Sequence, residues 1–502
     1  MLELNKVVET PKIPGFDIQE IGVVESVRKI IVIAKGLPSC INGQMVHFEK
    51  GTRGIVMGFK EESVQILVLS SGSEIRNGDQ IINRGEPLCL PAGDQFLGRI
   101  VSGICEPMDE KGPIEPTTFL PVIRDAPGIM DRIPVEKTLE TGTLAIDAGI
   151  PIALGQRQLL IGDRLTGKTT IAVDAILNQK NTGVICIYCC IGKPYASLMR
   201  VIQLLAERGA MPYTIIVSGV SSAPVAEQYL APYTAAMLGE YFMENGRDVL
   251  VVFDDLTKHA WTYRQISLLL ERAPGREAYP GDIFYIHSQL VERAAYLKPE
   301  LKGGSMTFLP IVEILQGDVT GYISTNLISM TDGQVYFNSS LFNKGTRPAV
   351  DFGLSVSRIG SKAQWAAMKD VSKSLRIEYL QYQELLQMSQ IRSSGLSKEA
   401  EARLKRGAAM TALLNQNKNK PIPVEKQVLN LFALNKGVLD LLSQDQLKLF
   451  KEDFYQYMLT SEPELLTTLR KEKKITNEIK EKLNQRLKDF FDRQNKPDKA
   501  RN

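Results

Sequence analysis

The pattern of apolar and polar residues changes twice along the chain. From Ile21 to about Leu90 it consists of short runs rich in β-branched residues, such as "KIIVIAKG" and "SVQILVLSSG", separated by Gly, Asn and Ser. Short β-rich runs between turn residues are typical of antiparallel strands. We therefore expect a small β-barrel over residues 1–89.

Between Leu90 and Gln364, apolar runs alternate with helical patterns. "QLLIG", "GVICIYCC", "YTIIVSG" and "DVLVVFDD" are separated by segments such as "TTIAVDAILNQ" and "YASLMRVIQLLAERG". Buried strands that alternate with helices are typical of a parallel sheet covered by helices. The sequence predicts an α/β domain over residues 90–364.

After Trp365 the strand pattern fades and apolar residues recur at helical spacing. This spacing runs through "WAAMKDVSKSLRIEYLQYQELLQMSQ", "SKEAEARLKRGAAMTALL" and "ITNEIKEKLNQRLKDFFDRQ", which predicts a helical bundle over residues 365–502. Ser461 and Glu464 in "SEPE" have the spacing of a capping box, so we expect a helix to begin there. The final "NKPDKARN" is expected to be a frayed tail.

Composition narrows the class of protein. The 502 residues include 60 basic and 57 acidic side chains, a net charge of +3, which argues against nucleic-acid binding through bulk charge. Six cysteines, with Cys186, Cys189 and Cys190 in one apolar run, indicate buried thiols and a cytoplasmic location. No run approaches the roughly 18 to 20 apolar residues that span a bilayer, so any membrane link is expected to be through partner proteins.

The segment "GDRLTGKTT" has the spacing of a phosphate-binding Walker A loop. In such a loop backbone N–H groups surround the phosphates, the lysine reaches the terminal ones and the hydroxyl binds Mg²⁺. The apolar run before it and the helical pattern after it supply the strand, loop and helix that the motif requires. We expect ATP or ADP with Mg²⁺ to contact Gly162, Asp163, Arg164, Leu165, Thr166, Gly167, Lys168, Thr169 and Thr170, with Thr169 on the metal.

The run "DVLVVFDD" ends in Asp254 and Asp255, where a Walker B carboxylate would orient Mg²⁺. We assign Asp254 to the metal; the alternative is a buried strand whose terminal aspartate caps the next helix. Hydrolysis also needs a group that orients the attacking water. The loop "IGKPYA" offers Lys193, which cannot accept a proton while charged, although it could equally be a solvated loop lysine.

The three histidines, His47, His259 and His287, are scattered along the chain and lack clustered Cys or Asp partners. This pattern does not indicate a zinc site. We expect ordinary structural roles for them.

Four segments together resemble the alpha subunit of rotary F-type ATP synthases: "GDRLTGKTT", "VVFDDLTKHAWTYRQISLLLERAPGREAYPGDIFYIHSQLVERAA", "ISTNLISMTDGQVYF" and "KGTRPAVDFGLSVSRIGS". The likeness extends from about Ile21 to Gln485. It implies a RecA-like P-loop domain between a barrel and a helical domain. It also implies alternation with catalytic beta-type subunits in a hexamer around a gamma-type shaft, peripheral to the cytoplasmic face of the membrane.

The resemblance also assigns roles to residues outside the loop. Arg358 in "VSRIG" matches the arginine finger that acts on the neighbouring beta-type site, and Phe342, Arg347, Pro348 and Gln416 match residues on the adenine side. The family's alpha subunits bind nucleotide without hydrolysing it. This chain departs from them at Leu165, Lys193 and Lys418, each of which replaces a glutamine.

Other members of the family dock a delta subunit of the peripheral stalk through an N-terminal helix. Pro11 and Pro14 would break a long helix, so conventional delta binding is in doubt. One alternative to an ordinary ATP synthase subunit is an alpha-like subunit of a rotary ATPase that drives other machinery, such as a motility apparatus. Others are a homohexameric translocase or secretion ATPase, and a structural ring component with an empty site.

Overall fold

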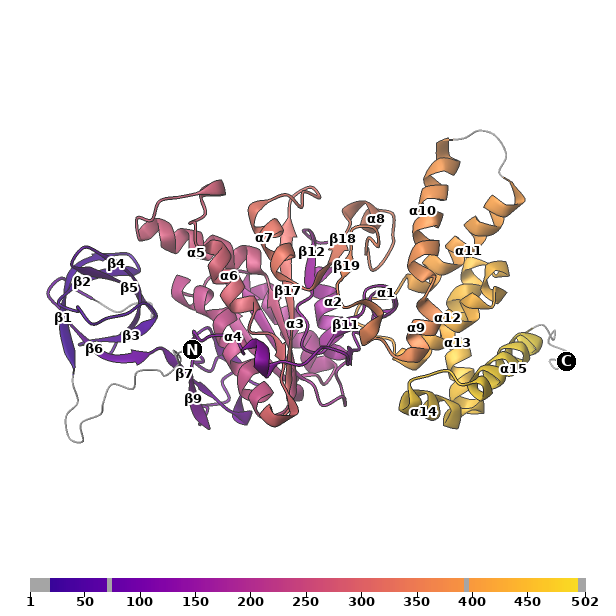
Figure 1. Cartoon of the computed structure of the whole chain (residues 1–502), viewed down its shortest axis with the longest axis horizontal. Helices are drawn as coiled ribbons and strands as arrows, with labels where there is room; N and C mark the ends of the chain where they lie inside the picture. Colours follow the sequence, from indigo (N-terminus) through magenta and orange to yellow (C-terminus); the bar gives the residue numbers. More distant parts are fainter. Residues whose placement is uncertain (1–18, 70–74, 392–396, 495–502) are drawn as a thin grey trace.

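The chain folds into three consecutive parts, a barrel, a sheet covered by helices and a helical domain (Figure 1). The computed structural model describes residues 19–69, 75–391 and 397–494. The expectations about Pro11, Pro14 and the last eight residues lie outside the described residues.

The first part is a closed antiparallel barrel, as the sequence predicts. Its strand order is β1-β2-β5-β4-β3-β6. Alternate residues point inward because successive side chains of a strand face opposite sides; in β3, Val46 and Phe48 are buried while Met45 and His47 are less so. The strands are β1 (Glu20–Arg28), β2 (Ile31–Lys35), β3 (Gln44–Phe48), β4 (Arg53–Lys60), β5 (Ser63–Val68) and β6 (Gln80–Pro87).

The central part is built on a nine-stranded sheet with the order β19-β18-β12-β17-β15-β13-β14-β8, and β16 pairs with β17. From β18 to β8 every neighbouring pair on this path is parallel, so the carboxyl ends of these strands meet at one edge. The strands are β8 (Ile100–Ser102), β12 (Leu159–Asp163), β13 (Ile185–Ile191), β14 (Thr214–Gly219), β15 (Asp248–Asp254), β16 (Ala295–Tyr296), β17 (Ser305–Ile314), β18 (Gly333–Phe337) and β19 (Val356–Ser357).

Helices pack against this sheet and bury its apolar strands. All seven residues of β13 are buried, and Cys186, Cys189 and Cys190 are free buried thiols, as expected. A short two-stranded sheet, β7 (Cys89–Ala92) with β9 (Thr118–Pro121), follows the barrel. The helices are α1 (Leu144–Gly149), α2 (Lys168–Leu177), α3 (Tyr195–Glu207), α4 (Val225–Glu244), α5 (Leu256–Leu269), α6 (Ile283–Val291), α7 (Tyr322–Met330) and α8 (Ser339–Asn343).

One ion pair lies wholly inside this domain. Glu240 of α4 accepts from the guanidinium of Arg293 at 2.7 and 2.6 Å, and Arg293 also donates to the carbonyl of Val122 at 2.9 Å. Both charged side chains are buried. Buried charges persist only when they are paired and hydrogen-bonded, so this pair fixes α4 relative to the segment after α6.

The last part is helical, as predicted, but the segment that starts at Trp365 divides into two helices. The helices are α9 (Ala366–Ser372), α10 (Leu375–Ile391), α11 (Lys398–Leu414), α12 (Val424–Asn435), α13 (Gln444–Ser461), α14 (Pro463–Glu472) and α15 (Asn477–Gln494).

A helix does begin in "SEPE", as expected, but the capping box at Ser461 is wrong. Ser461 is the last residue of α13, and its hydroxyl donates to the carbonyl of Tyr457 at 2.8 Å. The next helix begins at Pro463, with Glu462 at the N-cap. Proline suits the first helical position because it has no N–H to leave unpaired and its φ is already helical.

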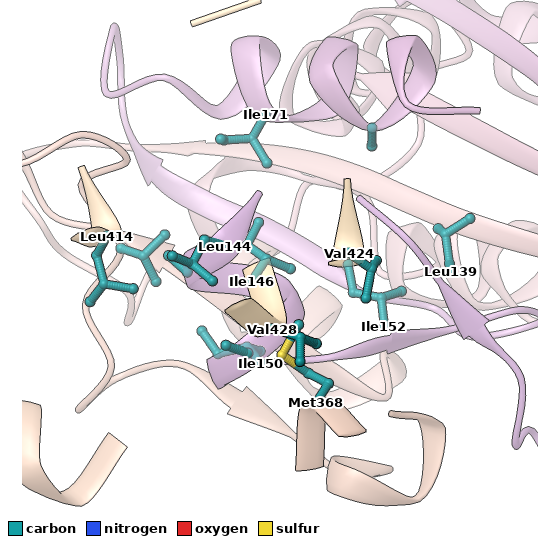
Figure 2. Close-up of a cluster of buried hydrophobic side chains, with 14 of the residues drawn as sticks. Leu139, Leu144, Ile146, Ile150, Ile152, Ile171, Met368, Leu414, Val424 and Val428 are labelled. Atoms are coloured by element: carbon teal, nitrogen blue, oxygen red, sulfur yellow. The ribbon is translucent and has the colours of Figure 1, made fainter. Parts of the chain in front are cut away.

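The helical domain is joined to the sheet domain by a shared apolar cluster (Figure 2). A buried polar contact lies beside it: Asp147 of α1 accepts from Thr141, from the backbone of Gly142 and from the amide of Gln427 on α12. Because one core includes both domains, we infer that their relative position is fixed. The labelled side chains of the cluster are Leu139, Leu144, Ile146, Ile150, Ile152, Ile171, Met368, Leu414, Val424 and Val428.

Among the residues that the structure describes, no helix is both long and apolar enough to cross a membrane.

Two of the three histidines are not scattered in space. His259 of α5 and His287 of α6 are fully buried. Nδ1 of His259 lies 3.3 Å from Nε2 of His287. Nε2 of His259 lies 3.0 Å from the carbonyl of Tyr229. Burial lowers the pKa of His259 to about 4, and burial together with the charge of His259 lowers the pKa of His287 well below its usual value. The pair is therefore neutral in the folded protein at neutral pH.

This buried pair should make the protein less stable as the pH falls below about 6.5. The unfolded chain binds protons there while the folded pair does not, so protons favour unfolding. Urea unfolding of the full chain between about pH 6.5 and 5 should show a slope of up to about 1.4 kcal/mol per pH unit from each histidine. Replacing both by glutamine should remove that part of the slope; an unchanged slope would contradict the prediction.

Candidate functional site

The phosphate-binding loop connects β12 to α2 at the carboxyl edge of the sheet. Gly162 lies against β18, and a Cβ there would come within 2.4 Å of the carbonyl oxygen of Phe337. Gly167 is the N-cap of α2 with a φ of 101°, and no side chain caps the helix. The N–H groups of the first turn are therefore available to an anion, and the helix dipole favours one.

Lys168 is the first residue of α2 and is buried against the loop. Its ammonium donates to the carbonyl oxygens of Gly162 at 2.8 Å and Asp163 at 2.5 Å. Burial lowers its pKa to about 8, although the charge of Glu313 opposes the shift. A lysine held over the loop in this way fits the phosphates of a nucleotide.

Asp163 has a structural role that the motif does not reveal. Its carboxylate accepts from the backbone of Gly317 at 2.8 Å and from the hydroxyl of Ser339 at 2.9 Å, and its carbonyl accepts from Thr166 at 2.7 Å. These bonds hold the loop to the segment after β17 and to the start of α8. At the tip of the loop, Leu165 has a φ of 65° and is 83% exposed.

Asp254, at the end of β15, is fully buried. One oxygen accepts from the hydroxyl of Thr169 at 2.9 Å and from Tyr188 at 2.7 Å. Its other oxygen forms an ion pair with Lys193, whose ammonium also donates to Thr169 at 3.1 Å. The structure therefore brings Thr169 and Asp254 together, with the charge of Lys193 against both.

Asp255 caps the next helix. Its carboxylate accepts from the backbone N–H of Lys258 at 2.8 Å and begins α5. The helix-capping interpretation of "DVLVVFDD" therefore applies to Asp255. Burial, reinforced by the charge of Asp254, raises the pKa of Asp255 to about 7.

Lys193 is not a solvated loop lysine, because only 18% of its side chain is exposed. Burial alone would lower its pKa, but the charges of Asp254 and Asp255 and the hydrogen bond to Asp254 outweigh burial and raise it. Its ammonium is therefore charged at neutral pH.

The residues assigned to the adenine side form a second group. The guanidinium of Arg347 lies 4.8 Å from the ring centroid of Phe342 in α8, and Pro348 follows Arg347. The backbone N–H of Gln416 donates to the carbonyl of Arg347 at 2.7 Å. This group adjoins the loop through Ser339, which begins α8 and contacts Asp163.

The side chain of Gln416 is already bonded to the protein. Its oxygen accepts from the backbone of Leu144 at 3.2 Å, and its amide donates to the carbonyls of Gly142 at 2.8 Å and Lys420 at 2.9 Å. Both amide hydrogens are used, so Gln416 connects the helical domain to the sheet domain. Lys418 is exposed.

Arg358 lies apart from these groups. It directly follows the edge strand β19, and its backbone N–H donates to the carbonyl of Asp332 at 2.9 Å. Its side chain is exposed. Within the described parts of the chain, its guanidinium makes no hydrogen bond or ion pair.

The contacts around Asp254 test whether Mg²⁺ fits where the sequence predicts it. A divalent ion would need the hydroxyl of Thr169 and the charge of Asp254, and the ammonium of Lys193 contacts both. A divalent ion among these groups would also lie beside a charged lysine, which repels it. The residues present therefore fit the phosphates of a nucleotide but do not fit the metal.

The sequence pattern also gave no role at the site to Tyr188. It lies in the middle of the apolar run "VICIYCC", and its hydroxyl is directed at Asp254. A tyrosine in a buried strand needs a partner for its hydroxyl, and that is the signal that could have found it. The contacts of Asp163 with Gly317 and Ser339 left no such signal, because they join residues 154 and 176 positions apart.

A Walker A loop and a buried aspartate on a parallel sheet define a P-loop nucleotide-binding protein. Three family models cover most of the chain: the ATP synthase alpha/beta family β-barrel domain at residues 17–85, its nucleotide-binding domain at 142–357 and its C-terminal domain at 364–490. The chain belongs to the ATP synthase alpha/beta family.

Two curated relatives place it closer to one branch of that family. A protein of Aquifex aeolicus named ATP synthase subunit alpha is 45% identical over 477 residues, which cover 95% of each chain. A protein of Wolinella succinogenes with the same name is 44% identical over 489 residues, which cover 97% of this chain and 95% of the relative. The resemblance seen in the four sequence segments thus extends over almost the full length.

Replacing Tyr188 by phenylalanine should lower the free energy of unfolding by about 1.5 to 3 kcal/mol, because the lost hydrogen bond is to a charged, buried group. Tyr213→Phe is the matched control. Its hydroxyl donates to the neutral carbonyl of Ile176 at 3.2 Å, so its removal should cost about 0.5 to 1.5 kcal/mol. Urea unfolding of the full chain measures both; equal costs would show that the charge of Asp254 does not strengthen the bond.

Proposed function

We propose that this chain is a nucleotide-binding, non-hydrolysing alpha-type subunit of a rotary ATPase head. The observation that carries the proposal is the contact of Lys193 with Thr169 and Asp254. Hydrolysis needs a group that orients or deprotonates the attacking water next to the terminal phosphate. A charged ammonium has only donors and cannot accept that proton.

The other carboxylates at this edge of the sheet are poorly placed to act as the base. Asp255 is fully buried and caps α5. Glu313 of β17 faces the ammonium of Lys258, with Nζ and Oε2 3.8 Å apart. The loop can therefore hold a nucleotide while lacking a group to hydrolyse it.

Nucleotide binding rests on the loop itself. The uncapped N-terminus of α2 and the ammonium of Lys168 face the position of the phosphates, and Phe342 with Arg347 offers a flat, cationic surface on the adenine side. The exposed Arg164 and Leu165 can add contacts only at the rim of the loop, whereas Thr170 is half-buried in α2. Gln416 contributes through its backbone N–H, which donates to the carbonyl of Arg347, and Pro348 directly follows Arg347.

The partners follow from the names of the relatives. We infer a ring in which this chain alternates with a catalytic beta-type subunit around a gamma-type shaft, attached to the membrane through other subunits. A head of this kind that drives other machinery remains the second proposal. The full-length likeness to proteins named ATP synthase subunit alpha favours the first, and it disfavours a homohexameric translocase.

Arg358 supports the ring by its position. It is an exposed arginine without a partner among the described residues, next to an edge strand that another chain can approach. A guanidinium can donate to two phosphate oxygens at once and stabilises the charge of the phosphoryl-transfer transition state. We infer that it acts as an arginine finger on the beta-type site.

The pure full chain should hydrolyse ATP no faster than a Lys168→Ala variant, because Lys193 supplies no base. A coupled phosphate-release assay at neutral pH measures both proteins. Lys168→Ala controls for contaminating ATPases, since it disables only this loop. Turnover by the parent that Lys168→Ala abolishes would overturn the non-hydrolysing assignment.

In a head reassembled with the beta-type subunit, Arg358→Lys should lower ATP hydrolysis by about 10³- to 10⁵-fold, the usual contribution of an arginine finger. Lysine keeps the charge but loses the two-pronged hydrogen bonding, so ring assembly and nucleotide affinity should stay nearly unchanged.

The matched control is Arg84→Lys, which changes an exposed arginine on the barrel strand β6. It should leave hydrolysis within about twofold, as surface substitutions usually do. If Arg358→Lys in an assembled ring behaves like this control, Arg358 is not a finger.

A further inference from the structure

We propose that Lys193 takes the place of Mg²⁺, so that this site binds a metal-free nucleoside di- or triphosphate in preference to its magnesium complex. The inference rests on the proposed nucleotide-binding function and names the form of ligand that the site selects. The three side chains on which it depends, Lys193, Thr169 and Asp254, all belong to the sheet domain of this chain.

The ammonium of Lys193 has the contacts that a metal ion would have. In P-loop proteins the loop hydroxyl and the Walker B carboxylate hold the ion, and the ion bridges phosphate oxygens. Here Nζ of Lys193 donates to Thr169 and pairs with Asp254. An ammonium has three N–H donors, so one remains for a phosphate oxygen.

The backbone around Lys193 holds it in this position. Gly192 has a φ of 61°, and a Cβ there would come within 2.7 Å of the side chain of Lys258. The carbonyl of Lys193 accepts from the backbone of Ser221 at 2.9 Å. Both flanks of the residue are therefore packed against neighbouring elements.

Asp254 also keeps Lys193 in place. Its carboxylate is fully buried, and Thr169 and Tyr188 supply only neutral donors. If Lys193 moved out to solvent, the carboxylate would lose its only counter-charge within the contacts described, and a buried charge without a counter-charge is strongly unfavourable. Only 18% of the lysine side chain is exposed, consistent with a fixed position.

Charge decides which form of nucleotide fits. Lys168 and Lys193 already supply two positive charges at the loop, and Asp254 neutralises one of them. A divalent ion carried in with the nucleotide would lie next to Lys193 and be repelled, whereas the uncomplexed phosphates meet both ammonium groups. The site therefore favours the nucleotide without its metal.

The direct test is a calorimetric titration of the full chain with ATP, first in EDTA and then with excess Mg²⁺. We expect binding in EDTA, and an affinity that does not improve with Mg²⁺, since Mg²⁺ in solution competes for the triphosphate. Equilibrium dialysis with Mn²⁺ at saturating ATP should find no ion retained by the chain. Binding at least about tenfold tighter with Mg²⁺, or one Mn²⁺ retained per chain, would overturn the inference.

Two variants sharpen the test. Lys193→Gln removes the charge, so it should weaken binding in EDTA and make ATP bind at least about tenfold more tightly with Mg²⁺ than without. Lys258→Gln is the matched control: it changes a neighbouring lysine that contacts Glu313 and Trp261 but neither Thr169 nor Asp254, and it should keep the parent's response to Mg²⁺. A Lys193→Gln protein that remains insensitive to Mg²⁺ would overturn the inference.

The measurements also separate this inference from the function on which it rests. ATP binding that requires Mg²⁺ contradicts the role of Lys193 but leaves a non-hydrolysing, nucleotide-binding subunit. No binding in either condition contradicts both. If Lys193→Gln does not fold, the EDTA and Mn²⁺ measurements on the parent chain still decide the question.

Discussion

The buried carboxylate of Asp254 is the constraint on which the site depends. A carboxylate that is fully shielded from water must be paired and hydrogen-bonded, and its partners come from three places: Tyr188 within β13, Lys193 after β13 and Thr169 in α2. The contact that satisfies this charge also directs a lysine to the position of the phosphates. Under the proposed function, the same contact stabilises the fold and leaves the site without a group to hydrolyse ATP.

The helical domain contributes to the geometry of the site as well. Gln416 joins the backbone beside Arg347 to the segment before α1, and Gln427 completes the hydrogen bonding of the buried Asp147. The shared apolar cluster in Figure 2 adds the hydrophobic part of this connection. Because the residues proposed for the adenine side lie at this junction, we infer that the sheet domain alone would not keep their arrangement.

Local patterns predicted the large-scale fold well. Strand and helix periodicity depend on neighbouring residues, so the barrel, the parallel sheet and the helical domain could be recognised, and the Walker A loop could be found because it is contiguous. Contacts between residues that are far apart in the sequence could not be predicted in this way. Lys193 and Asp254 are 61 positions apart, and His259 and His287 are 28 apart on different helices. In "SEPE" the local pattern predicted the start of a helix correctly but not its cap, because the helix begins at Pro463.

The two cationic residues that distinguish this chain's proposed role are held in opposite ways. Lys193 is packed on both sides and its charge is paired with Asp254 of the same chain. It is therefore placed to act on a ligand that enters the chain's own loop. Arg358 is exposed at the sheet edge with its guanidinium unpaired among the described residues. An arginine that is left without an internal partner can act on a group supplied by another molecule at little desolvation cost. Under the proposed function, the chain therefore does not hydrolyse the nucleotide in its own loop, but it contributes an arginine to hydrolysis in the neighbouring subunit.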